Sequence, residues 1–96
     1  MNKGTFNPAQ KSYVCIHVFR NERPVLLVNR ADGDWCLLCG GMHKNSASEL
    51  RVVGIGHLLQ RDPSLLALID LPPEWEAERE SPSGPWLRTP CKAMDA

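Results

Sequence analysis

The chain lacks any apolar run near the roughly 18 residues that a membrane-spanning helix requires, so no membrane segment is expected. Its opening, MNKGTFNP, contains a lysine but no apolar stretch, so we expect no secretory signal. Without an export signal we expect a cytoplasmic protein, in which the four cysteines (Cys15, Cys36, Cys39 and Cys91) stay reduced.

An excess of charge of one sign is also missing. Eleven Lys and Arg residues balance eleven Asp and Glu residues, which gives a formal net charge of zero. Proteins that bind nucleic acid in general carry a basic field that neutralises phosphates, so we expect no nucleic-acid partner.

Signatures of catalysis are missing as well. No G-x-S-x-G elbow occurs, and Gly54-Ile55-Gly56-His57 has neither the lysine of a phosphate loop nor the third glycine of a dinucleotide fingerprint. His17 and His57 are more typical of surface or core histidines than of catalytic ones. We therefore expect a protein that is not an enzyme, with no catalytic residue and no cofactor.

What the sequence does contain is the composition of one globular domain. It has 96 residues, of which 43% are hydrophobic and 23% charged, a balance too apolar for a disordered chain. We expect a loose arm over residues 1–11, one domain over residues 12–88 and a frayed tail over residues 89–96.

Alternating apolar residues and turn signals predict strands in the first half. Residues 13–19 form the first predicted strand, and residues 25–28 form a second that is antiparallel to it. Asp32-Gly33 predicts a tight hairpin leading into a third strand over residues 35–39.

The second half changes period. Residues 50–53 predict a short strand, although propensity alone also allows the start of a helix, and residues 55–61 predict a short helix. Asp62 is placed to cap a second helix that begins at Pro63 and ends by Pro72-Pro73. Residues 75–80 are compatible with an acidic helical turn or an edge strand, and we favour the strand.

These elements predict an α+β fold, with a mostly antiparallel sheet of four or five strands and two short helices on one face. The predicted core consists of Val14, Ile16, Val18, Leu26, Val28, Leu37, Val52, Leu58, Leu65, Leu68 and Ile69.

The cysteines suggest one metal hypothesis. Cys36 and Cys39 have the C-x₂-C spacing of a zinc knuckle, His43 follows, and Cys15 or His17 from the neighbouring strand offers a fourth ligand. However, successive residues of a strand alternate between its faces, so Cys36 and Cys39 point apart if residues 35–39 are extended. Reduced cysteines acting as small core residues are the alternative, and a redox dithiol is disfavoured because Gly40-Gly41 is a poor helix start.

Acidic residues gather beside tryptophan near the end of the chain. Residues 1–48 carry six basic and three acidic side chains, whereas residues 49–96 carry five basic and eight acidic ones. An acidic surface next to tryptophan suits docking of a basic protein, although it is equally compatible with ordinary solvated surface. The candidate partner-binding residues are Trp75, Glu76, Glu78, Glu80 and Trp86.

Several segments together resemble a group of small bacterial domains of unknown function, some of which are classed as immunity proteins of polymorphic toxin systems. These segments are GDW (33–35), RVVG (51–54), QRDPSL (60–65), LIDLP (68–72), EAER (76–79) and PW (85–86). The resemblance covers roughly residues 12–88, and Cys36, Cys39 and the proline pair before Trp75 depart from it. It implies a compact α+β domain without catalytic residues that binds and neutralises a cognate toxin.

The leading functional hypothesis is therefore a non-enzymatic protein-binding module and, more specifically, an immunity protein that neutralises a cognate toxin. The alternatives are a small zinc domain built on Cys36, Cys39 and His43, and an accessory domain that works only beside another chain.

Overall fold

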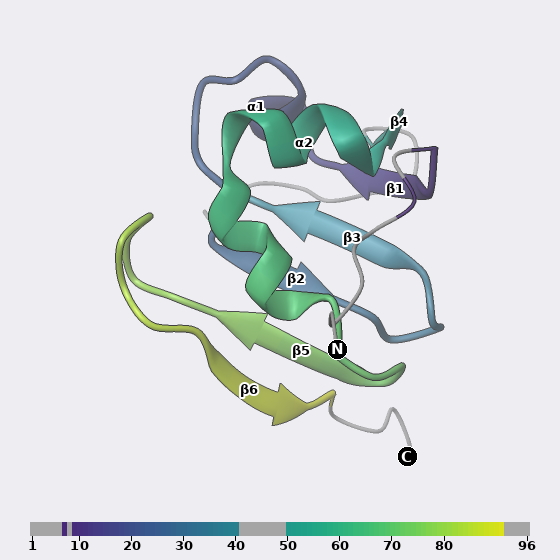
Figure 1. Cartoon of the computed structure of the whole chain (residues 1–96), viewed down its shortest axis with the longest axis vertical. Coiled ribbons are helices and arrows are strands. Elements are labelled where there is room, and N and C mark those ends of the chain that lie inside the picture. Colours follow the sequence, from purple (N-terminus) through teal and green to yellow (C-terminus); the bar gives the residue numbers. More distant parts are fainter. Residues whose placement is uncertain (1–6, 8, 41–49, 92–96) are drawn as a thin grey trace.

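The computed structural model describes residues 7, 9–40 and 50–91, which form six strands, two α-helices and one 3₁₀ helix (Figure 1). Within these ranges no helix has the length and apolar character that crossing a bilayer requires. The elements in chain order are β1 (Lys11–Val14), α1 (Ile16–Phe19), β2 (Leu27–Asn29), β3 (Trp35–Leu38), β4 (Arg51–Gly54), α2 (Ile55–Arg61), the 3₁₀ helix η2 (Pro63–Leu68), β5 (Trp75–Glu78) and β6 (Leu87–Pro90).

The strands form one mixed sheet in the order β4-β1-β3-β2-β5-β6. β1 and β3 run parallel, whereas every other neighbouring pair is antiparallel. The α+β class and the mostly antiparallel sheet are confirmed, but the sheet has six strands instead of four or five. The additional strand is β6, which pairs with β5 and includes Thr89 and Pro90.

The strand expected over residues 13–19 is wrong beyond Val14, because the chain leaves the sheet and forms the single turn α1. The amide of Phe19 donates to the carbonyl oxygen of Cys15 at 2.8 Å, the i to i−4 bond of a helix. Burial of Val18 in the core outweighs the β-propensity of this segment. The expected pairing of the second strand with the first is wrong too, since β2 lies between β3 and β5.

The hairpin predicted at Asp32-Gly33 is confirmed and joins β2 to β3. Gly33 has φ of +83°, which residues with a Cβ rarely adopt, and its amide donates to the carbonyl oxygen of Arg30 at 3.0 Å. Glycine is needed here for its backbone freedom.

The two helices after β4 begin where the sequence predicts, although the second ends at Leu68 and not at Pro72-Pro73. α2 covers residues 55–61 as predicted, and Asp62 caps the next helix by accepting a hydrogen bond from the amide of Ser64 at 3.1 Å. That helix is the 3₁₀ helix η2, so the structure has three short helices where two were expected. The extended interpretation of the acidic segment is confirmed by β5, but its placement at an edge is wrong, because β5 pairs with β2 on one side and with β6 on the other.

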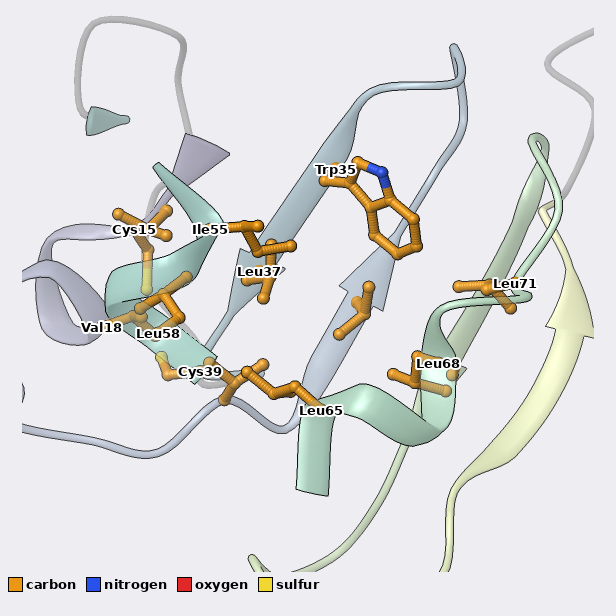
Figure 2. Packing of buried hydrophobic residues seen from close by; sticks show 14 residues of the cluster. Cys15, Val18, Trp35, Leu37, Cys39, Ile55, Leu58, Leu65, Leu68 and Leu71 are labelled. Carbon is orange, nitrogen blue, oxygen red and sulfur yellow. The ribbon is translucent and has the colours of Figure 1, made fainter. Parts of the chain in front are cut away.

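A single hydrophobic core lies between the helices and one face of the sheet (Figure 2). Seven of the predicted core residues are buried, whereas Ile16, Leu26 and Ile69 are only half-buried and Val52 is 57% exposed. Val52 was wrongly placed because it is paired with Tyr13, on the face of the sheet that points away from the core. The buried hydrophobic residues that the prediction omitted are Cys15, Val25, Trp35, Cys39, Ile55, Leu71 and Ala77.

Candidate functional site

The five candidate partner-binding residues do not lie on one face. Ala77 is fully buried against the core, so Trp75 shares its side of β5 while Glu76 and Glu78 point to the opposite side. Trp75 is 37% exposed. The two glutamates therefore contribute to a different surface from the tryptophan that precedes them.

The other two candidates follow β5. Glu80 is exposed in the connection to β6. The indole of Trp86 is half-buried under the guanidinium of Arg79, whose Cζ lies 4.2 Å from the centroid of the Trp86 ring. Trp86 thus packs against the core and the Arg79 side chain, and it offers a partner less surface than the sequence suggested.

One face of the sheet has no helix over it in the described part of the chain. The buried residues of α1, α2 and η2 all join the same core cluster on the other face, and in Figure 1 α2 and η2 lie on one side of the strands. We call the uncovered side the open face. Strand register gives it two rows of side chains, Val52-Tyr13-Cys36-Asn29-Glu76-Thr89 and Leu38-Leu27-Glu78-Leu87, with Lys11 at one corner.

The open face combines apolar side chains with carboxylates. Leu27 and Leu38 are half-buried in its middle, and Leu87 is 63% exposed at the β6 edge. Glu78 lies between Leu27 and Leu87 in the cross-strand row. In the neighbouring row, Asn29 Nδ2 donates a hydrogen bond to Glu76 Oε1 at 2.9 Å, which orients that carboxylate.

Cys36 lies on the open face, away from Cys39. Burial raises the pKa of the Cys36 thiol, and the negative charges of Asp34 and Asp32 raise it further. The side chain is therefore a neutral thiol near pH 7, a poor nucleophile and a poor metal ligand without deprotonation. The C-x₂-C pair consequently does not act as a chelating unit, because the buried Cys39 faces the core. His43 lies outside the described residues.

Cys39 meets a different set of side chains. The ligand atoms of Cys15, His17 and Cys39 all lie within 4.8 Å of one another, and His17 Nδ1 is 3.8 Å from Cys39 Sγ. Cys15 and Cys39 are 2% and 3% exposed, and Figure 2 shows them near Val18 at one end of the core. We call these three residues the thiol–imidazole cluster. It is the one group of three or more potential metal ligands found among the described residues.

The topology explains why the cluster forms. β1 and β3 are parallel neighbours, with Val14 level with Leu37, so their carboxyl ends lie at the same edge of the sheet. Cys15 directly follows β1, and Cys39 directly follows β3. Sequence reasoning offered Cys15 or His17 as the fourth ligand and not both together, because it treated residues 13–19 as a strand and did not expect the parallel pair.

Comparison of the chain with protein-family models, with curated proteins and with solved structures found no match. The resemblance to bacterial immunity domains therefore stays a prediction.

Proposed function

We propose that this chain is a non-enzymatic protein-binding module whose open face docks a basic protein, and that the partner is a toxin in the manner of an immunity protein. The observation that carries the proposal is a sheet face on which apolar side chains lie next to two carboxylates, with no helix over it in the described residues.

The composition of the open face fits a contact surface. Protein interfaces combine an apolar centre, which loses water on binding, with polar groups around it that select the partner. Leu27 and Leu38 supply the apolar centre, while Glu76 and Glu78 supply negative charge on β5. Asp34, on the β2–β3 hairpin, adds to the negative charge that Cys36 experiences. This pattern favours an occupant with exposed apolar side chains bordered by Lys or Arg.

The first experiment identifies the partner. We would co-express the chain with the protein products of the genes on either side of its own and purify the complexes at near-physiological salt. We expect one of those products to co-purify in a stable complex and to lose its toxicity in cells that make this chain. Failure of every adjacent product to bind would overturn the proposal.

The second experiment places the contact. The double variant Glu78→Lys, Leu87→Ser changes two cross-strand neighbours on exposed positions, so the fold should persist. We expect the affinity for the partner to fall at least about tenfold, which corresponds to about 1.4 kcal/mol. The matched control is Glu22→Lys, Leu66→Ser, which makes the same chemical changes at exposed positions outside the open face.

Two results would contradict the assignment of the surface. The control pair could weaken binding as much as the open-face pair, which would show that the contact lies elsewhere. Alternatively, sedimentation of the chain alone could show a dimer that the open-face variant dissociates, which would make a second copy the occupant.

A further inference from the structure

We infer that Cys15, His17 and Cys39 bind one divalent transition-metal ion of the zinc type. The site is separate from the proposed docking surface, because Cys15 and Cys39 are buried in the core on the opposite side of the sheet from the open face. Two thiolates and an imidazole are typical protein ligands of zinc, and three protein ligands leave a fourth position for water or another donor.

The distances are compatible with one ion. Sulfur and nitrogen ligands at about 2.3 Å and about 2.0 Å from a tetrahedral zinc ion lie about 3.6 Å from each other. His17 Nδ1 and Cys39 Sγ are 3.8 Å apart, and no pair of ligand atoms in the cluster exceeds 4.8 Å. Rotation of the side chains is enough to close a difference of about 1 Å, so the backbone need not move.

The backbone around the three ligands is held in place. β1 and β3 fix Cys15 and Cys39 at the ends of paired strands. The carbonyl oxygen of His17 accepts hydrogen bonds from the amides of Glu22 at 2.8 Å and Arg23 at 3.3 Å, which anchors the turn that carries the imidazole. Ligands on such a scaffold lose little conformational entropy when an ion binds, and this favours affinity.

The charges also suit a dication. Two thiolates and a neutral imidazole give the ligand set a charge of about −2, which one zinc-type ion neutralises. Arg23 Nη1 donates to Cys39 Sγ at 3.9 Å, and donors to sulfur are a common outer contact of metal thiolates.

The test uses the full chain, purified under reducing conditions and freed of metal by a chelator. Titration with Co²⁺ should give the visible bands of a tetrahedral ion and a thiolate charge-transfer band, both saturating at one ion per chain. Zn²⁺ should displace Co²⁺ and abolish both bands.

The variants separate this site from adventitious binding by thiols. His17→Gln and Cys39→Ser should each weaken Co²⁺ binding at least about tenfold. The first variant should change the visible bands by loss of the imidazole ligand, and the second should weaken the charge-transfer band by loss of one thiolate. Cys36→Ser and Cys91→Ser are the matched controls, because both cysteines are half-buried, outside the cluster and free of disulfide bonds. These two variants should bind Co²⁺ with the same affinity and the same spectrum as the parent chain. Circular dichroism of each metal-free variant shows whether a loss reflects unfolding, and His17, which is half-buried, is the substitution least disruptive to the core.

Three outcomes would overturn the inference. Co²⁺ could fail to bind the folded chain, or it could bind with equal strength after His17→Gln and Cys39→Ser. Binding could also be lost in Cys36→Ser or Cys91→Ser, which would place the ion on the other thiols.

Discussion

Arg79 and Asp62 form the more buried of the two ion pairs in the described part of the chain. Arg79 Nη2 lies 2.6 Å from Asp62 Oδ2, and the side chain of Arg79 is only 1% exposed against 26% for Asp62. The same guanidinium donates to the carbonyl oxygen of Val25 through Nε and Nη2, and to Ser64 Oγ and the carbonyl oxygen of Pro82 through Nη1. One side chain thus joins the end of β5 to the cap of η2, to the segment before β2 and to the turn before β6.

Replacing Arg79 should therefore destabilise the whole domain. Arg79→Met keeps the apolar stem but removes the hydrogen bonds that Arg79 donates to Asp62 Oδ2 and to the Val25 carbonyl oxygen, which should cost about 3–5 kcal/mol. Urea denaturation measures the free energy of unfolding. The control is Arg88→Met, which removes the ion pair of Arg88 with Asp70. These two side chains are 35% and 59% exposed, so the pair should contribute about 0–1 kcal/mol. An equal loss of unfolding free energy in the two variants would contradict the larger contribution assigned to the buried Arg79.

Asp62 should also make stability depend on pH. Burial raises the pKa of Asp62, but hydrogen bonds from Ser64 and Arg79 and the charge of Arg79 outweigh it, so the pKa lies below its ordinary value. Such a carboxyl stabilises the fold above its unfolded pKa of about 3.9, and the contribution is lost as pH falls through the folded pKa.

Asp62→Asn should consequently be less stable than the parent chain at pH 7, and the difference should shrink as the pH falls below about 4. Denaturant unfolding at a series of pH values measures both curves. If the difference in unfolding free energy between the two proteins stayed constant at pH values well below 4, Asp62 would contribute through its shape and not through its charge.

Packing of η2 supplies a test of the core. Leu68 is 1% exposed and belongs to the core cluster, whereas Leu66 on the same 3₁₀ helix is 41% exposed. Leu68→Ala should cost about 2–5 kcal/mol, because it removes apolar contacts and leaves a cavity. Leu66→Ala should change stability by about 0.5 kcal/mol or less, since an exposed position leaves no cavity. Comparable losses at both positions would mean that η2 is rotated relative to the sheet.

Local signals in the sequence predicted the local elements. Gly33 and Asp62 mark a turn and a cap whose chemistry is carried by a few adjacent residues, and both lie where the sequence places them. The prediction of a strand over residues 13–19 was wrong beyond Val14, because the alternation of apolar residues there covers too few positions to distinguish a strand from a helical turn. The parallel pairing of β1 with β3 depends on contacts between residues far apart in the sequence, which no local pattern encodes.

In the candidate sites too, features set by adjacent residues were predicted better than features that depend on residues far apart in the sequence. The extended form of β5 was predicted, and alternation along it is what separates Trp75 from Glu76 and Glu78. The thiol–imidazole cluster was predicted only in part: the sequence offered Cys15 or His17 as one ligand beside Cys39, but the three residues meet only because β1 and β3 lie side by side. The C-x₂-C spacing of Cys36 and Cys39 directed attention to a pair that the pleat of β3 separates.

The environment of Cys36 predicts slow reaction of a thiol that lies on the proposed docking surface. Burial and the charges of Asp34 and Asp32 raise its pKa, so little thiolate is present near pH 7. Asp34→Asn removes one of these charges, and the pH at which alkylation of Cys36 by iodoacetamide accelerates should shift downward. Mass spectrometry of the Cys36 peptide across a pH series gives this profile, with Asp70→Asn as an exposed control. An unchanged profile in Asp34→Asn would leave burial and the charge of Asp32 as the causes of the raised pKa, and it would remove Asp34 from the negative charge attributed to the open face.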